Sequence, residues 1–174
     1  RDSNFDVYHN DEFIGHFDLP LYGKHMVLNA LSVIVFSYLE GLDITEVHDA
    51  IKSFKGAKRR FKEKKIGNVI TIDDYAHHPT EIKVTLEAVR QKYPNKRVVV
   101  VFKPNTYSRT RDFKDDFIEA LNVADKAYLT EIDCNREFPI DYPGVTSKII
   151  IDGLRDGEYM KILGKYKNGN YNVV

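Results

Sequence analysis

Residues 69–102 read VITIDDYAHHPTEIKVTLEAVRQKYPNKRVVVVF, the pattern of a strand, a helix and a second strand. Residues 69–72 are all β-branched, as strands prefer. Ile82, Leu86 and Val89 then recur at the spacing of one buried helical stripe. Residues 98–102 are apolar throughout, which predicts a central strand buried on both faces. A unit of this kind predicts parallel strands joined by a right-handed crossover.

The alternation of helix and strand continues towards the end of the chain. A helical stripe runs through Phe113, Phe117, Leu121 and Ala124, and residues 127–132 form the next predicted strand. Residues 149–154 are predicted to be helical, and residues 159–163 and 171–174 to be strands, with a turn at 167–170. We therefore expect residues 56–174 to form a Rossmann-like α/β domain with a mostly parallel, doubly wound sheet, truncated at its end.

The first 55 residues have a different pattern. Residues 5–19 alternate around Asn10 and Asp11, which predicts a hairpin. Apolar residues between 28 and 39 have helical spacing that ends at Gly41, and a second helix is predicted from Thr45, as its cap, to residue 54. These elements close no sheet of their own. We expect residues 1–55 to be the tail of a larger domain. The chain begins at Arg1 and not at methionine, so we expect either an excised fragment or a mature chain whose start has been removed.

The composition excludes several classes of protein. Twenty-six basic residues balance twenty-six acidic ones, so no net charge attracts nucleic acid or an anionic membrane. Cys134 is the only cysteine, which excludes an internal disulfide. No apolar run approaches the roughly 20 residues that span a bilayer, and no signal peptide opens the chain. The sequence predicts a cytoplasmic protein without nucleic-acid or membrane partners.

Residues 73–79, DDYAHHP, lie where the strand at 69–72 gives way to a helix. Ligands of open parallel sheets bind at the carboxyl ends of strands. Carboxylates and imidazoles there could bind a metal, donate hydrogen bonds to a substrate or hold sugar hydroxyls. The structural alternative is that Asp74 caps the loop and that His78 is an N-terminal helix residue before Pro79.

Residues 103–111, KPNTYSRTR, follow the strand at 98–102 and precede a helix. The guanidinium of Arg109 matches a carboxylate or a phosphate, and backbone amides at the helix start would add to an anion site. We expect this segment to lie beside residues 73–79 on one edge of the sheet. The alternative is a solvated helix start in which Arg111 pairs outward with Asp115, four residues on.

Two weaker segments complete the set. The basic run 58–60, followed by Phe61, is either a solvated surface or a phosphate site at a domain junction. In residues 23–30, GKHMVLNA, Asn29 could recognise adenine or face solvent. The sequence contains no G-x-x-x-x-G-K-[ST] phosphate loop and no G-x-G-x-x-G motif, so we expect that the chain alone does not hydrolyse ATP by the phosphate-loop route.

These four segments, in this order, resemble the Mur ligase family across essentially the whole chain. The string DDYAHHP with the downstream Pro-x-x-Tyr-Ser-Arg-Thr resembles the alanine-adding member in particular. The resemblance implies an ATP-dependent ligase of peptidoglycan synthesis with three domains. Residues 1–55 would then be the carboxyl-terminal piece of the central ATP-binding domain, and residues 56–174 most of the carboxyl-terminal, amino-acid-binding domain. It implies that ATP and Mg²⁺ serve to phosphorylate UDP-N-acetylmuramate, and that the amine of L-alanine then attacks the acyl phosphate.

The resemblance also implies roles for seven residues. On the nucleotide side, Asn29 would hydrogen-bond to adenine, Arg60 would reach the phosphates, and Asp74 would hold the ribose hydroxyls with Tyr75 nearby. On the amino-acid side, the implied pocket residues are His77, His78 and Arg109, with Arg109 pairing with the alanine carboxylate. No catalytic residue and no metal ligand of this chain is implied.

The chain departs from the family pattern in two places. Relatives often have His-Arg where this chain has Asn105 and Thr106, so the amino-acid pocket must be completed differently. Many relatives carry asparagine where Met26 stands, which leaves adenine recognition more dependent on Asn29. A later family segment rich in glycine and aspartate is absent from the chain.

Three alternatives stay open beside a Mur ligase fragment that is inactive alone. The first is a metal-dependent phosphoesterase with Asp73, Asp74, His77 and His78 as ligands. The second is a non-catalytic module that senses nucleotides. The third is a peptidoglycan or folate ligase of the same family that adds a different amino acid.

Overall fold

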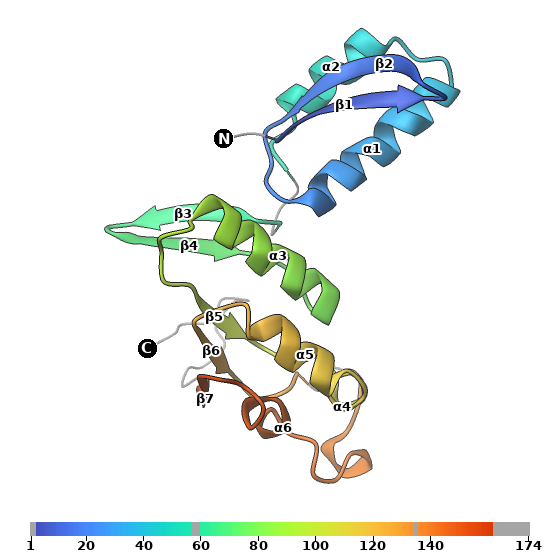
Figure 1. Ribbon diagram of the computed structural model, residues 1–174. Helices are drawn as coiled ribbons and strands as arrows, with labels where there is room; N and C mark the ends of the chain where they lie inside the picture. The colour runs from blue at the N-terminus through green and yellow to red at the C-terminus, as the bar shows by residue number, and fades with distance from the viewer. Residues whose placement is uncertain (1–2, 57–59, 134–135, 162–174) are drawn as a thin grey trace, which may run out of the picture. The chain divides into compact units, whose positions relative to one another are not determined.

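The computed structural model describes residues 3–56, 60–133 and 136–161 (Figure 1). The chain divides into two compact units. Unit 1 comprises residues 1–76 and 87–94, and unit 2 comprises residues 77–86 and 95–174. The turn expected at 167–170 and the strand expected at 171–174 lie outside the described residues. The predicted domain boundary after residue 55 stays a prediction.

Unit 1 opens with the predicted hairpin. Strand β1 (Ser3–His9) pairs antiparallel with β2 (Glu12–Leu19), and Ser3 lies opposite Leu19. The turn residues Asn10 and Asp11 have φ values of 48° and 67°. Tight hairpin turns require this left-handed backbone, and short polar side chains tolerate it, so the turn forms at the expected place.

Two helices pack with this hairpin, as Figure 1 shows. Helix α1 (Lys24–Leu39) ends before Gly41, which has φ 72°, and α2 (Ile44–Ser53) follows. Their shared core with the hairpin contains Val7, Phe17, Leu19, Ala30, Ile34, Val47 and Ile51.

The stripe predicted for α1 is only partly buried. Ile34 is fully buried, but Leu28, Val35 and Leu39 are 52%, 44% and 70% exposed. The reason is that α1 is apolar around much of its circumference, and the buried row of Ala30, Ile34 and Ser37 is narrow. The apolar stripe predicted from spacing is therefore wider than the face of α1 that the hairpin and α2 cover.

The cap of α2 is one of the corrections to the sequence prediction. Asp43, not Thr45, is the N-cap, because its carboxylate Oδ1 accepts a hydrogen bond from the Thr45 amide at 2.8 Å. A carboxylate at this position satisfies one of the unpaired amides of the first turn.

Unit 1 also contains a second hairpin. Strand β3 (Lys62–Ile66) pairs antiparallel with β4 (Val69–Asp73) across a turn at Gly67, which has φ 58°. The strand expected at 69–72 is therefore present, but within the described residues it pairs with β3 and not with the parallel sheet. Strand β3, whose five residues are all exposed, was not predicted from the sequence.

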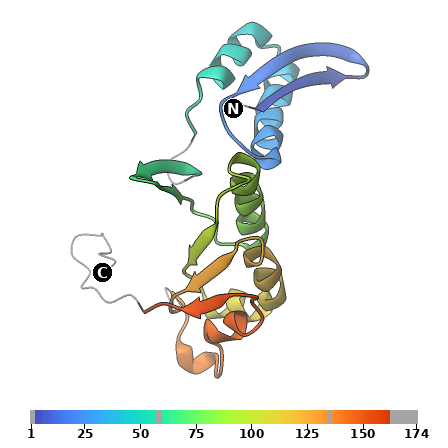
Figure 2. The same cartoon turned by 60° about the vertical axis from the view of Figure 1, so that its left-hand side comes forward.

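Unit 2 contains the parallel sheet that the sequence predicts. Strands β5 (Val99–Phe102), β6 (Lys126–Leu129) and β7 (Gly157–Tyr159) are parallel in the order β5-β6-β7, and Figure 2 shows them side by side. In the described sheet β5 is an edge strand, which corrects the expectation of a central one. Val99 and Val101 are 46% and 61% exposed, so β5 is buried on one face only.

The helices of unit 2 follow the predicted alternation with one added break. Helix α3 (Pro79–Lys92) contributes residues 79–86 to unit 2 and the rest to unit 1. The stripe expected from Phe113 begins only in α5 (Lys114–Leu121), because Phe113 ends the short helix α4 (Tyr107–Asp112). A 3-10 turn η1 (Pro139–Asp141) and α6 (Lys148–Ile151) lie between β6 and β7.

The core of unit 2 is centred on Phe117, Leu121, Leu129 and Ile150, each at most 1% exposed. These side chains come from α5, β6 and α6, so the alternating elements bury their apolar faces against one another. In the described part of the chain, no helix is both long enough and apolar enough to cross a membrane.

Candidate functional site

The four residues expected on the nucleotide side all lie in unit 1. Asn29 is an exposed residue of α1, and Arg60 is exposed beside Phe61. Asp74 and Tyr75 follow β4, and Tyr75 is 47% exposed.

The carboxylate of Asp74 organises its own loop. Its Oδ1 accepts a hydrogen bond from the Ala76 amide and its Oδ2 one from the Phe61 amide, both at 2.8 Å. The second bond joins the loop after β4 to the residue next to Arg60, where Phe61 has φ 48°. The structural alternative for Asp74, a loop cap, is therefore confirmed. Each carboxylate oxygen can accept a second hydrogen bond, so the expected ribose contact stays a prediction.

His25 also belongs to this region, although the sequence did not single it out. The pKa of its imidazole is lowered overall. Burial is the largest cause and lowers the pKa, the Asp74 carboxylate raises it, and the Arg60 guanidinium lowers it. Because both charges act on one imidazole, the structure brings Arg60 and Asp74 to the same part of unit 1. The sequence feature that could have indicated His25 is its position in the segment GKHMVLNA, four residues before Asn29.

The residues expected on the amino-acid side lie in unit 2. At the start of α3, Glu81 Oε2 accepts hydrogen bonds from the amides of His77 (3.0 Å) and His78 (3.2 Å), and lies 3.3 Å from His77 Nδ1. A glutamate in the first turn that reaches back in this way is half of a capping box.

His78 has the structural role that was kept open for it. Its Nδ1 accepts a hydrogen bond from the Thr80 amide at 3.3 Å, and its ring meets the Phe113 ring edge-on at 4.9 Å. His78 is therefore an N-terminal residue of α3 whose ring packs on the residue between α4 and α5. The substrate-binding roles of His77 and His78 stay predictions.

Arg109 lies on α4 and is half-buried. Within residues 3–56, 60–133 and 136–161, no carboxylate forms an ion pair with its guanidinium. Arg111 differs, because its Nε lies 2.7 Å from Asp112 Oδ1. The expected pair of Arg111 with Asp115 is wrong: the helix breaks at Phe113, so position i+4 is not on the same helical face.

The residue that begins α4 has an unusual backbone. Thr106 has φ 68° and ψ 143°, a conformation that β-branched residues rarely adopt. Such a residue costs about 1–3 kcal/mol and persists only when its surroundings hold it. The Thr106 amide donates to the Asp133 carbonyl oxygen (3.1 Å), and the Thr110 hydroxyl donates to the Thr106 carbonyl oxygen (2.7 Å).

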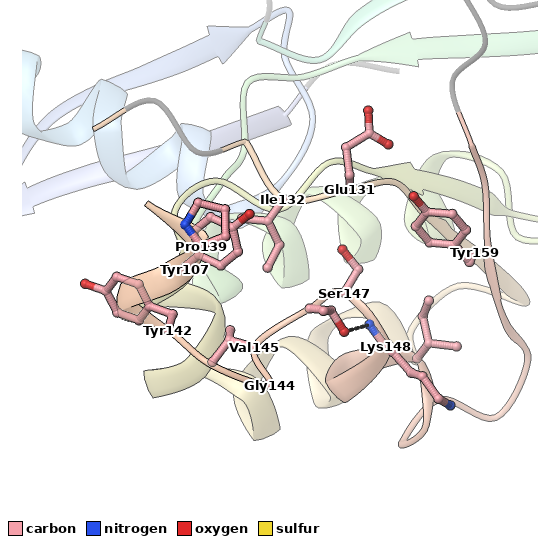
Figure 3. A pocket seen from close by; sticks show the side chains of 12 residues that line it. Tyr107, Glu131, Ile132, Pro139, Tyr142, Gly144, Val145, Ser147, Lys148 and Tyr159 are labelled. Atoms are coloured by element: carbon pink, nitrogen blue, oxygen red, sulfur yellow. Dashed lines mark hydrogen bonds between the residues drawn. The ribbon is translucent and has the colours of Figure 1, made fainter. Parts of the chain in front are cut away.

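A pocket of about 620 Å³ adjoins this turn (Figure 3). Its lining includes Tyr107 from α4, Glu131 and Ile132 after β6, and Ser147 and Lys148 at the start of α6. It therefore lies past the carboxyl end of β6, where open parallel sheets bind ligands. The pocket leaves no local signal in the sequence, because its walls come from segments far apart in the chain.

The profile of the family described as Mur ligase, glutamate ligase domain, matches residues 59–165. The chain belongs to the Mur ligase family. The segments from which the family was expected thus belong to a Mur ligase chain. They are residues 23–30, the string DDYAHHP and the segment before Arg109. The Rossmann-like fold with a parallel sheet is confirmed with it.

Relatives of this Mur ligase chain share a name. It is 54% identical over 132 residues to the UDP-N-acetylmuramate–L-alanine ligase of Ligilactobacillus salivarius, covering 76% of this chain and 30% of that protein. It is 51% identical over 156 residues to the ligase of the same name from Lactococcus lactis, covering 89% of this chain and 35% of that one. The chain thus spans about a third of the length of these relatives.

A solved structure agrees with the sequence relatives. The crystal structure of the UDP-N-acetylmuramate-alanine ligase of Thermotoga maritima matches this Mur ligase chain with a TM-score of 0.74 and 29% identity. The match covers 92% of this chain and 34% of that one.

The described residues offer no cluster of metal ligands. Among them, no three His, Cys, Asp or Glu side chains are grouped closely enough to hold a metal ion. The phosphoesterase alternative, which needs Asp73, Asp74, His77 and His78 as ligands, therefore gains no support from the geometry.

Proposed function

We propose that this chain is part of an ATP-dependent ligase that joins L-alanine to UDP-N-acetylmuramate in peptidoglycan synthesis, in the cytoplasm. The observation that carries the proposal is the identity of 54% and 51% to two ligases of that name over most of this chain. The chain spans about a third of those proteins and has no phosphate loop, so we propose that it is inactive by itself.

Unit 2 would bind the amino acid. The Arg109 guanidinium, which pairs with no carboxylate in the described part of the chain, offers two parallel donors that match the carboxylate of L-alanine. Holding the carboxylate would fix the position of the amine, the nucleophile of the reaction. His77 and His78, placed by Glu81 at the start of α3, would complete this side of the site.

Unit 1 would bind the nucleotide. The donor types fit ATP: the Arg60 guanidinium suits phosphate, the Asn29 amide suits an adenine edge, and the Asp74 carboxylate suits ribose hydroxyls. Tyr75, exposed after β4, would lie near the nucleotide. ATP supplies the phosphoryl group that converts a poor electrophile, the carboxylate of the sugar nucleotide, into an acyl phosphate. We assign no residue of this chain to Mg²⁺, which would enter with the phosphates.

The test is phosphate release by a full-length ligase that contains residues 1–174, with the remaining length supplied by the Lactococcus lactis relative. Release should require both UDP-N-acetylmuramate and L-alanine, and the 174-residue chain alone should release none. Arg109→Ala should raise KM for L-alanine roughly 10- to 100-fold, the loss expected for a charge-assisted pair. Arg111→Ala, which removes the neighbouring guanidinium paired with Asp112, is the matched control and should change KM less than twofold, within about ±0.5 kcal/mol.

The amino acid offered to the enzyme separates this proposal from its family alternative. Glycine, L-serine, D-glutamate and L-alanine would be compared in the same assay. If one of the first three is used with a higher kcat/KM than L-alanine, the chain belongs to a ligase that adds a different amino acid. Phosphate release by the isolated chain would contradict the proposal that it is inactive alone.

A further inference from the structure

Glu137 holds the start of α4 from a distant part of the sequence. It lies in the connection between β6 and α6, and its Oε2 accepts a hydrogen bond from the Ser108 amide at 2.9 Å. Its Oε1 accepts one from the Ser108 hydroxyl. Hydrogen bonds from the hydroxyl and amide of Ser108 lower the pKa of Glu137, so the group is an anion at neutral pH. Both oxygens of one carboxylate thus fix the residue next to Arg109.

Aromatic side chains join the same two segments. The rings of Tyr107 and Tyr142 are stacked with centroids 5.8 Å apart and an interplanar angle of 17°. The Arg111 guanidinium lies 5.4 Å from the centroid of the Tyr142 ring. Residues 137–142 therefore contact α4 through a carboxylate at its start and a ring along its side.

The contact between residues 137–142 and α4 helps to hold a strained start of the helix. Thr106 begins α4 in a backbone conformation that threonine disfavours. Asp133 holds the amide of Thr106 from one side, and Glu137 holds Ser108 from the other. Arg109 is the next residue of the helix. The backbone that leads into Arg109 is therefore held at two points.

We propose that Glu137 is a positioning residue for the amino-acid substrate: by holding Ser108, it sets the orientation of Arg109 towards the substrate carboxylate. The proposal rests on the role of Arg109 in the proposed function. Glu137 contacts no substrate itself. It orders the turn before substrate binds, so that the Arg109 guanidinium does not have to be ordered during binding.

The experiment is a KM and kcat comparison in the full-length ligase described above. Glu137→Ala should raise KM for L-alanine about tenfold, because loss of hydrogen bonds to a charged acceptor has effects of this size, while KM for ATP stays unchanged. Glu137→Gln keeps an acceptor oxygen for the Ser108 amide and should recover part of the loss. Asp141→Ala removes a nearby exposed carboxylate of the same connection and should leave both KM values unchanged.

A double-mutant cycle shows whether Glu137 acts through Arg109. In the Arg109→Ala background, Glu137→Ala should add less than twofold to KM for L-alanine, because the side chain that it positions is gone. An equal tenfold effect in both backgrounds would overturn the positioning role. An unchanged KM for L-alanine in Glu137→Ala would also overturn the positioning role. If Glu137→Ala does not fold, an unchanged KM for L-alanine in Glu137→Gln would overturn it.

The outcomes also separate this inference from the proposed function. If Arg109→Ala leaves KM for L-alanine unchanged, the proposed role of Arg109 fails, and the positioning role fails with it. If Arg109→Ala raises KM and Glu137→Ala does not, only the positioning role fails. Thermal unfolding of each variant shows whether a change in KM reflects loss of the fold.

Discussion

The amide of Thr106 donates a hydrogen bond to the carbonyl oxygen of Asp133 at 3.1 Å and ties the end of one strand to the end of the next. The pair continues the parallel ladder of β5 and β6 through a bridge between Asn105 and Asp133. A second link is the ion pair between Lys103 Nζ and Asp133 Oδ2 at 2.8 Å. Thr106 is held at φ 68° in this position, where a glycine would be unstrained.

Thr106→Gly should therefore stabilise the chain. Relief of about 1–3 kcal/mol of backbone strain exceeds the loss of about 1 kcal/mol that glycine brings through the entropy of the unfolded chain. The free energy of unfolding, measured by urea denaturation, should rise by up to about 2 kcal/mol. Thr106→Val keeps the branched side chain and should give no gain, and a gain of equal size in that variant would show that strain at φ 68° is not the cause.

Loss of the α2 cap should destabilise unit 1. Asp43→Ala removes the acceptor of the Thr45 amide and should lower the free energy of unfolding by about 1 kcal/mol. Asp43→Asn keeps a good capping group and should lower it by less than half of that amount. Equal losses in the two variants would mean that the charge of Asp43, and not its hydrogen bond, stabilises the helix.

The stability of unit 1 should depend on the titration of His25. Burial, with a smaller contribution from Arg60, lowers the pKa of His25 from its ordinary 6.5. The unfolded chain therefore binds this proton more readily than the folded chain. The resulting stability is fully present above pH 6.5 and is lost as the pH falls through the folded pKa.

The measurement for His25 is urea denaturation at about pH 7.5 and about pH 5.5, with His25→Gln as the non-titrating variant. The wild-type chain should lose more stability than His25→Gln between the two pH values. Parallel losses would show that His25 does not contribute. Asp74→Asn removes the charge that opposes the shift and should lower the pKa of His25 further, which an NMR titration of the imidazole would detect.

The core of unit 2 should be sensitive at Phe117. This side chain is fully buried, and its ring centroid lies 5.3 Å from that of Phe102 on β5. Phe117→Ala should lower the free energy of unfolding by about 3–5 kcal/mol, because it removes buried surface and leaves a cavity. Phe117→Leu should cost clearly less. A loss below about 1 kcal/mol in Phe117→Ala would contradict the burial of this ring.

The sequence predicted elements best where local periodicity is strong. Several elements form as expected: the turn at Asn10 and Asp11, the helices near 24–39 and 79–92, and the parallel strands near 99 and 127. Strand β3 was missed because its charged residues show no alternation of apolar and polar side chains. The edge position of β5 could not be predicted either, since an apolar run does not say how many neighbours a strand has.

Local sequence patterns likewise indicated some residues of the candidate site and not others. Asp74, His78 and Arg109 were chosen as candidates because they lie in dense polar segments at strand ends, and their binding roles stay predictions. Glu137 was not found, because its partner Ser108 is 29 residues away and no local pattern joins the two. Arg111 was assigned the wrong partner because the helix break at Phe113 depends on packing and not on spacing.

Within the described part of the chain, the β3–β4 ribbon offers a protease an early cutting site. A two-stranded antiparallel ribbon is marginally stable by itself, and every residue of β3 is exposed. Lys62, Lys64 and Lys65 are trypsin sites that local opening of the ribbon presents without unfolding either core. Brief digestion should thus release two large fragments that separate near residue 64, before any cut within the buried elements of unit 2.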